Sequence, residues 1–319
     1  MKLLITGPLG HIGSKFIHHL RPGEYDQVIL LDNLSTQRYC SLFNLPEGVP
    51  FQFVEADVCT ADLESLFQGI DVVVHLAAIT DAANSFENAD QVEKVNYEGT
   101  ERVARVCAAI GARMAFFSTT SVYGTQEELV DENCSADELK PQSPYAASKL
   151  KAERMLQQLG QSDGLKFVVC RFGTIFGTSI GMRFHTAINK FCWQACMGQP
   201  ITVWRTALHQ KRPYLELNDA IRALDFIIKN DRFDNQIYNV LSANATVGEI
   251  VNTIQTHVPD TRIEYVDARI MNQLSYEVSC EKFKALGFDF KGNLEAGIAA
   301  SINLLINAHS MGHHVAEPS

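Results

Sequence analysis

The chain has 319 residues, 46% of them hydrophobic and 20% charged, a composition typical of a soluble globular protein with one large core and an attached lobe. Its net charge of −10 argues against a nucleic-acid-binding surface, and no run approaches the roughly 18 apolar residues of a membrane span. The eight cysteines form no CxxC pair or Cys/His zinc pattern, so no metal site is expected. Met1 runs directly into the first apolar segment, so we expect no signal peptide and a cytoplasmic location.

Residues 2–32 have the pattern of a nucleotide-binding βαβ unit. The apolar residues 2–6 predict a buried strand, and apolar residues 28–31 predict a second strand that ends on Asp32. Between them lies a turn followed by helical spacing, and its glycines are Gly7, Gly10 and Gly13. In such a unit the glycines permit a tight turn and close approach of the backbone to a pyrophosphate.

Asp32 indicates which dinucleotide is bound. A carboxylate at this place accepts hydrogen bonds from both ribose hydroxyls of an adenosine, which favours NAD over NADP. Arg38, six residues further on, keeps NADP open as the alternative.

Apolar runs and helical patterns alternate after this unit, which is typical of a doubly wound parallel sheet, so the predicted fold is α/β of Rossmann type. We expect strands at 51–55, 71–76, 114–118 and 166–171, and helices at 61–67, 89–110 and 144–159. The polar loop 124–144 is expected to rim the site.

After residue 177 the alternation loosens, which predicts a smaller C-terminal α/β lobe. We expect helices at 184–197, 219–228, 247–258, 281–286 and 294–308, and strands at 201–203, 214–217, 236–240 and 262–266. Strand 236–240 is expected to rejoin the main sheet. The predicted domains are an NAD-binding domain at 1–177 with a return of about 214–245, a mainly substrate-binding lobe at 178–308, and a flexible tail at 309–319.

Tyr145 and Lys149 lie four residues apart on the helix expected to begin near Pro144, so they share one helical face. A nearby ammonium stabilises a phenolate, so we expect Lys149 to lower the pKa of Tyr145 and to allow proton exchange there. Lys149 could also hold a ribose hydroxyl.

Three motifs occur in order: TGPLGHIG at 6–13, STTSVYG at 118–124 and SPYAASK at 143–149. This combination resembles the extended short-chain dehydrogenases/reductases, specifically the NAD-dependent nucleotide-sugar epimerase/dehydratase family, over about residues 1–306. DNLS at 32–35 resembles the version found in UDP-glucose/UDP-galactose 4-epimerases. The resemblance implies a Thr–Tyr–Lys catalytic set of Thr119, Tyr145 and Lys149.

The resemblance also implies the cofactor and substrate contacts. Asn96 is expected as a structural asparagine of the central helix, Thr174 stands where relatives often have Asn, and Arg183 is expected to bind a phosphate or a carboxylate. The implied NAD contacts are Gly7, Gly10, His11, Ile12, Gly13, Asp32, Asn33, Asp57, Val58, Leu76, Ala77, Ala78, Asn96, Ser118, Tyr145, Lys149 and Phe172. The implied substrate contacts are Thr119, Thr120, Thr174, Arg183, Arg212 and Arg269, with Arg212 and Arg269 gripping the diphosphate.

The reaction implied by the resemblance is 4-epimerisation of a nucleotide sugar, with a UDP-sugar favoured, through a transient 4-keto sugar. Family 4,6-dehydratases carry Asp-Glu directly after the catalytic Thr, where this chain has Thr120 and Ser121, and decarboxylases usually keep Glu at the position of Ser121. A 4-dehydrogenase/4-ketoreductase or a UDP-glucuronate decarboxylase-like enzyme stays open, as does a non-catalytic NAD(H)-binding protein. Relatives pair two helices per subunit, so helices 89–110 and 144–159 predict a homodimer.

Overall fold

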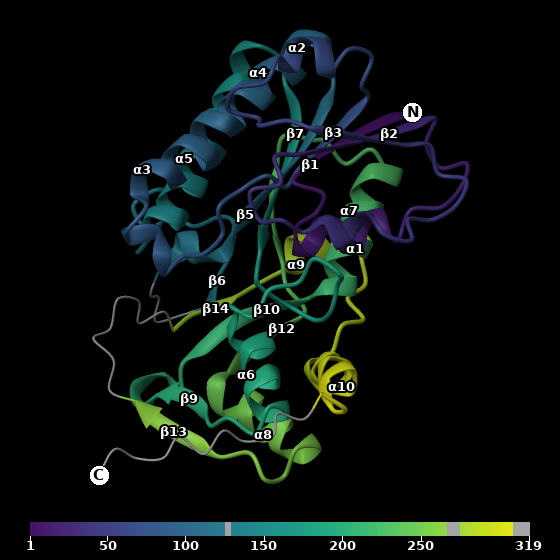
Figure 1. The fold of residues 1–319 in the computed structure, drawn as a ribbon. Helices are drawn as coiled ribbons and strands as arrows, with labels where there is room; N and C mark the ends of the chain where they lie inside the picture. The colour runs from purple at the N-terminus through teal and green to yellow at the C-terminus, as the bar shows by residue number, and fades with distance from the viewer. Residues whose placement is uncertain (125–128, 267–274, 309–319) are drawn as a thin grey trace.

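Seven parallel strands form the central sheet of the computed structural model, which describes residues 1–124, 129–266 and 275–308 (Figure 1). Their order is β11-β7-β5-β4-β1-β2-β3. The strands are β1 Lys2–Thr6, β2 Gln27–Asp32, β3 Phe51–Glu55, β4 Val72–His75, β5 Arg113–Thr119, β7 Lys166–Phe172 and β11 Ile237–Val240. This sheet confirms the predicted Rossmann-type architecture. The strand order turns back between β1 and β4, where doubly wound sheets bind ligands at the carboxyl ends of the strands.

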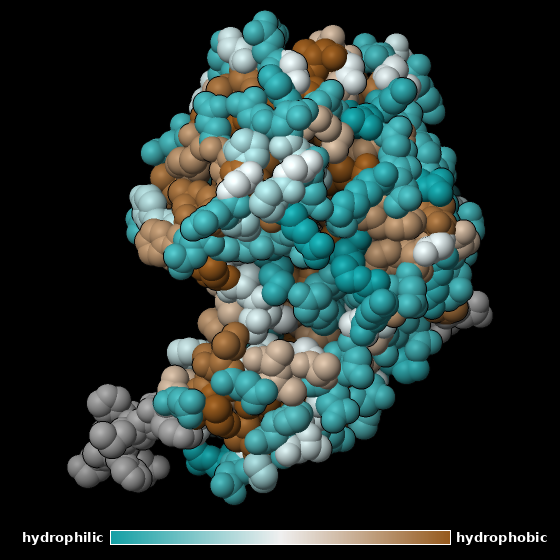
Figure 2. All heavy atoms as spheres, turned by 90° about the vertical axis from the view of Figure 1, so that its right-hand side faces the viewer, coloured by the Kyte–Doolittle hydropathy of each residue, from teal (hydrophilic) through white to brown (hydrophobic). Residues whose placement is uncertain are grey.

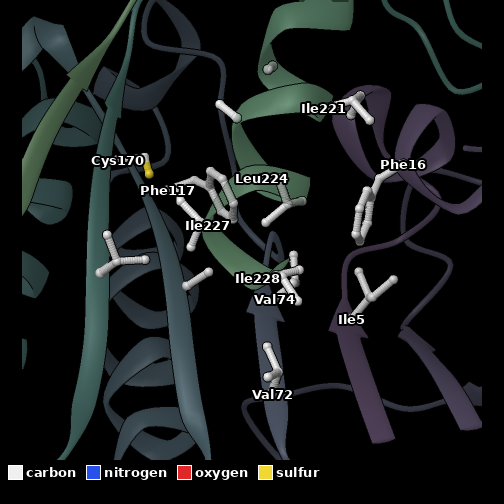
Figure 3. Packing of buried hydrophobic residues seen from close by; sticks show 14 of the residues in the cluster. Ile5, Phe16, Val72, Val74, Phe117, Cys170, Ile221, Leu224, Ile227 and Ile228 are labelled. Atoms are coloured by element: carbon white, nitrogen blue, oxygen red, sulfur yellow. The ribbon is translucent and has the colours of Figure 1, made fainter. Parts of the chain in front are cut away.

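Helices cover both faces of the sheet. The pair α1 (His11–Ile17) and α7 (Leu217–Lys229) lies on one face, and α2 (Leu63–Leu66), α4 (Gly99–Ile110) and α5 (Pro144–Ser162) lie on the other (Figure 1). In Figure 3, Phe16 of α1 and Leu224 of α7 point toward Ile5 and Val74 of the strands. Successive strand residues enter opposite cores, which explains why the strands are apolar throughout.

A second core lies in the smaller lobe at the bottom of Figure 1. Its three-stranded sheet has the order β12-β10-β8, and β9 pairs with β13 beside it. These strands are β8 Thr174–Phe176, β9 Ile201–Trp204, β10 Lys211–Glu216, β12 Ala243–Thr246 and β13 Ile263–Val266. The helices of the lobe are α6 Ala187–Cys196, α8 Val247–His257 and α10 Leu294–Leu305. The short strands β6 (Leu129–Val130) and β14 (Glu277–Val278) pair beneath the main sheet.

The segment around 214–245, expected to return to the first domain, is divided between the two sheets. Strand β11 pairs with β7 and α7 packs on the main sheet, whereas β10 and β12 pair with each other beside β8. The outer edge of β7 accepts one strand, and β11 occupies it. Helix α9 (Glu281–Lys284), from the segment expected to form the lobe, places Phe283 in the core of the main sheet.

All eight cysteines are free, and Cys40 is exposed. Within the described ranges we find no helix long and apolar enough to cross a membrane. The expected tail at 309–319 lies outside the described residues.

A buried ion pair joins α5 to the sheet. The Glu153 carboxylate accepts hydrogen bonds from the Arg171 guanidinium of β7, at 3.0 Å from Nε and 2.7 Å from Nη2, and from the Ser118 hydroxyl of β5. The side chains of Arg171 and Glu153 are only 3% and 2% exposed. Losing one partner of such a pair leaves an uncompensated buried charge, whereas replacing both partners avoids that cost.

We therefore expect Glu153→Ala to lower the free energy of unfolding by about 3–5 kcal/mol. A matched control is Glu101→Ala, which breaks the pair with Arg105, itself 61% exposed, and should cost about 0.3–0.5 kcal/mol for the lost pair. Urea unfolding measures both. The double variant Glu153→Leu/Arg171→Met should be more stable than Glu153→Ala, and equal effects for Glu153→Ala and the control would contradict the role of the pair.

Candidate active site

A cavity of about 1130 Å³ opens at the carboxyl ends of the main-sheet strands and extends to the lobe. Figure 2 shows the surface hollowed between the larger body and the lobe below it. Residues of the glycine turn line one part of the cavity, and lobe residues such as Phe191 and Trp204 line another. The cavity is therefore built from segments distant in sequence.

The glycine turn fits the dinucleotide that the sequence predicts. Gly7 has φ +67°, and a Cβ there would lie 2.7 Å from the Ala77 nitrogen. A Cβ on Gly13 would lie 2.6 Å from the Pro8 oxygen, so both positions require glycine. A Cβ on Gly10 would meet no protein atom closer than 3.4 Å. Gly10 lines the cavity, which leaves its backbone open to a ligand.

Acidic residues line the cavity beside this turn. The Asp32 carboxylate accepts hydrogen bonds from the Leu9 and Leu34 N–H groups at 3.2 and 2.9 Å, and burial raises its pKa. Asn33 donates to Asp57 at 3.1 Å. Burial acts to raise the pKa of Asp57, but this hydrogen bond and others lower it overall. The two carboxylates are thus held by local hydrogen bonds at the end of the cavity where an adenosine is expected.

The predicted catalytic residues converge from β5 and α5. Ser143 accepts the Ala146 N–H at 3.2 Å and caps the start of α5, and Pro144 occupies its first turn. The Tyr145 side chain lies close enough to the Thr119 side chain for their interaction to act on its pKa. Lys149, one turn further, faces the same cavity. The structure therefore brings together Thr119, Tyr145 and Lys149.

Burial dominates the pKa values of both helical residues. It raises the pKa of Tyr145 to about 12, which the Thr119 hydrogen bond only partly opposes. It lowers the pKa of Lys149 to about 7, although the Glu153 carboxylate acts in the opposite direction. Lys149 Nζ lies 4.6 Å from the centroid of the Phe116 ring. The prediction that Lys149 lowers the pKa of Tyr145 is wrong for the chain alone, because desolvation outweighs any attraction between the two groups.

Two predicted contacts do not line the cavity. Asn96 lies in a π turn (Lys94–Glu98) between α3 (Ala89–Glu93) and α4, and its amide holds the N–H and carbonyl of Ile79 at 2.8 and 2.9 Å. The Thr120 hydroxyl is buried and lies 3.4 Å from both the Phe172 carbonyl and the Tyr276 hydroxyl. These side chains position the backbone around the cavity instead of facing a ligand.

The remaining predicted contacts that the structure describes do line the cavity. They are Gly7, Gly10, His11, Ile12, Gly13, Asp32, Asn33, Asp57, Val58, Leu76, Ala77, Ala78, Ser118, Thr119, Tyr145, Lys149, Phe172, Thr174, Arg183 and Arg212. The hydroxyl of Ser118 is committed to Glu153. Arg269 lies outside the described residues. In the described part of the chain no three His, Cys, Asp or Glu side chains come together to hold a metal ion.

Residues that sequence reasoning missed complete the site. His75 lies between the Thr6 and Thr100 hydroxyls, at 2.7 and 2.9 Å, and burial lowers its pKa to about 3. His75 is the last residue of β4, and its position at the end of a predicted strand could have marked it as a site residue. Glu153 falls four residues after Lys149, on the same helical face. Only the tertiary fold brings Arg171 next to Glu153.

Comparison with known proteins identifies the family. A sequence model of the NAD dependent epimerase/dehydratase family matches residues 3–240. The chain is 31% identical over 312 residues to a trifunctional UDP-glucose 4,6-dehydratase/UDP-4-keto-6-deoxy-D-glucose 3,5-epimerase/UDP-4-keto-L-rhamnose-reductase of Arabidopsis thaliana, covering 93% of this chain and 46% of the plant protein. It thus spans about half the length of that relative.

Two bacterial proteins match most of both lengths. An uncharacterized UDP-glucose epimerase of Bacillus subtilis, YtcB, is 31% identical over 265 residues, which cover 80% of this chain and 81% of YtcB. The crystal structure of Thermus thermophilus UDP-glucose 4-epimerase in complex with NAD has a TM-score of 0.83 and 26% identity, covering 97% of this chain and 100% of that one. The chain therefore belongs to the NAD-dependent epimerase/dehydratase family, which confirms the family and the NAD cofactor predicted from the motifs.

Proposed function

We propose that this protein is a nucleotide-sugar 4-epimerase that acts through a transient 4-keto sugar, with a UDP-sugar as the favoured substrate. The observation that carries the proposal is that Thr119, Tyr145 and Lys149 line the same cavity as the glycine turn. NAD, when bound, supplies the acceptor and donor of hydride. The chain supplies orientation and proton transfer.

Each residue of the catalytic set has a separate role. Tyr145 takes the proton from the sugar C4 hydroxyl during oxidation and returns a proton to the oxygen after reduction. Thr119 donates a hydrogen bond that orients this oxygen. Lys149, buried in the same cavity, holds a ribose hydroxyl and carries positive charge when protonated. Rotation of the 4-keto sugar between the two hydride transfers inverts C4.

Among the described residues, no acid lines the end of the cavity where the sugar is expected. Elimination of water needs a general acid for the leaving hydroxyl in addition to the base. Thr120 is turned toward Phe172 and Tyr276, and Ser121 contributes a hydroxyl. Among the described residues, the acids that line the cavity are Asp32, Asp57 and Asp81. Asp32 and Asp57 lie at the adenosine end, and Asp81 accepts hydrogen bonds from Ala83 and Asn84 in its own loop.

The reaction is tested by incubating the purified protein with UDP-, GDP-, CDP- and dTDP-sugars without added cofactor. NMR of the products should show the C4 epimer of one sugar. A stable 4-keto sugar, a 6-deoxy-4-keto sugar or a pentose would replace the proposal by dehydrogenation, dehydration or decarboxylation, respectively. A dependence on added NAD(H) in every turnover would favour a 4-ketoreductase.

The homodimer is proposed from the family resemblance. Helices α3, α4 and α5 form one outer layer of the molecule (Figure 1), and they include the two segments expected to pair between subunits. Light scattering of the purified protein gives its mass in solution and tests this proposal.

Tyr145→Phe should lower turnover by about 10²- to 10⁴-fold, because it removes the proton-transferring hydroxyl and leaves the ring. Bound NAD, measured after acid release, should stay at the wild-type level. Tyr39→Phe is a control, since that side chain is 51% exposed and does not line the cavity. A fully active Tyr145→Phe protein would rule out the proposed proton transfer.

Lys149 should titrate near pH 7 in the NAD-free protein, far below its ordinary pKa of 10.5. Nitrogen-15 NMR of labelled lysine side chains should show one Nζ with this midpoint, and the signal should be missing in Lys149→Arg. Lys151, held by Glu93 at the surface, should titrate above 10.5.

Because the unfolded chain binds the Lys149 proton up to about pH 10.5 and the folded chain only to about 7, this group makes the free energy of unfolding rise with pH between those values. Titration of every lysine above pH 10 would contradict this.

A further inference from the structure

The segment of residues 179–185, here called the strap, crosses the glycine turn. The Ser179 hydroxyl and His11 Nδ1 are hydrogen-bonded at 2.8 Å, although 168 residues separate them. The Gly181 N–H donates to the Ser14 hydroxyl at 3.0 Å. A Cβ on Gly181 would lie 2.3 Å from the Leu9 oxygen, so glycine is needed for this close approach. The strap is therefore fixed directly on the nucleotide-binding turn.

The strap then carries two basic side chains into the cavity. Arg183 and His185 both line it. The Arg183 guanidinium donates to the Thr80 hydroxyl in the loop after β4, at 2.7 Å. The strap thus reaches from the glycine turn after β1 to the loop after β4, across the point where the strand order turns back. Arg38, which would lie 3.9 Å from a Cβ on Gly10, approaches the same turn from the β2 side.

Arg38 and Arg183 both line the cavity and are partly buried, and each is attracted by one aspartate. Burial lowers the pKa of Arg38 to about 10, and repulsion from Arg183 adds to the effect. Asp81 attracts Arg183, and Asp32 attracts Arg38. Asp32 also accepts hydrogen bonds from the Leu9 and Leu34 N–H groups, and Asp81 accepts them from the N–H groups of its own loop. Arg38 and Arg183 are thus near enough to repel each other, and an anion bound beside them would relieve that repulsion.

Two buried polar atoms without a hydrogen-bond partner belong to residues that line the same cavity. Within the described residues, His11 Nε2 and Arg183 Nε have no hydrogen-bond partner. Burial lowers the pKa of His11 to about 3, so its imidazole is neutral. His11 and Arg183 both line the cavity, so these two buried polar atoms lie beside it.

We propose that the strap closes over the cofactor's diphosphate, with Arg183 and Arg38 as its cationic contacts, and retains the cofactor between turnovers. Diphosphate oxygens match the planar donors of a guanidinium. This assigns Arg183 to cofactor retention and not to the sugar. It rests on the proposed function only in taking a dinucleotide as the ligand.

Retention follows from the way the strap is attached. A dinucleotide held under it leaves only when the contacts of Ser179 and Gly181 with α1 break or the arginines release the phosphates. An epimerase regenerates its cofactor in each turnover, so it loses nothing by slow exchange. A reductase must exchange its cofactor, and such a closure would limit its rate.

Two variants test the strap by different routes. Arg183→Gln removes the charge, and Gly181→Ala displaces the strap without changing charge. The controls are Arg262→Gln, an exposed arginine outside the cavity, and Gly248→Ala, where a Cβ would lie 3.3 Å from the Leu208 oxygen. The holoenzyme is loaded with radiolabelled NAD, and dissociation is followed after dilution into unlabelled NAD. Circular dichroism verifies that each variant is folded.

Both test variants should release NAD about 10- to 100-fold faster than wild type, the loss expected for a hydrogen bond to a charged group, while the controls release it at the wild-type rate. Wild-type release from Arg183→Gln together with a raised KM for the sugar nucleotide would overturn the proposal and place Arg183 at the substrate. Wild-type release from both folded variants would also overturn it. If both test variants release NAD faster than the controls but no sugar nucleotide is epimerised, the role of the strap is supported and the proposed 4-epimerase function is contradicted.

Discussion

The buried carboxylate of Glu153 sets the position of the catalytic helix. It accepts hydrogen bonds from Ser118 on β5 and Arg171 on β7, and it lies one helical turn beyond Lys149. A buried charge is tolerated only when its hydrogen-bonding capacity is met, so α5 has little freedom to slide along the sheet. With that distance fixed, Tyr145 reaches Thr119 at the end of the neighbouring strand. The proposed proton-transfer geometry thus depends on an ion pair whose residues do not line the cavity.

Burial also disfavours the charged forms of Tyr145 and Lys149. It raises the pKa of Tyr145 and lowers that of Lys149, so at neutral pH the phenol is protonated and the amine is near its midpoint. On the proposed mechanism, a positive charge beside Tyr145 in the loaded cavity would stabilise the phenolate and so favour proton transfer. The proposal thereby links the acid-base role of Tyr145 to occupation of the nucleotide site.

Segments far apart in the chain line the end of the cavity that contains the glycine turn. The glycine turn comes from the first residues, Arg38 follows β2, Thr80 follows β4 and the strap follows β8. The carboxyl ends of parallel strands meet at one edge of the sheet, which is why these loops converge. The lobe completes the cavity from the other side.

The sequence by itself determined the features that depend on local geometry. Helical spacing put Tyr145 and Lys149 on one face, the glycine spacing predicted the turn, and alternating patterns predicted the parallel sheet with Asp32 at a strand end. Only the tertiary structure shows that Thr120 and Asn96 do not line the cavity, that Arg183 reaches Thr80, and that burial raises the pKa of Tyr145. Side-chain direction, contacts across some 170 residues and desolvation all depend on how elements pack together, and no pattern within one element specifies that packing.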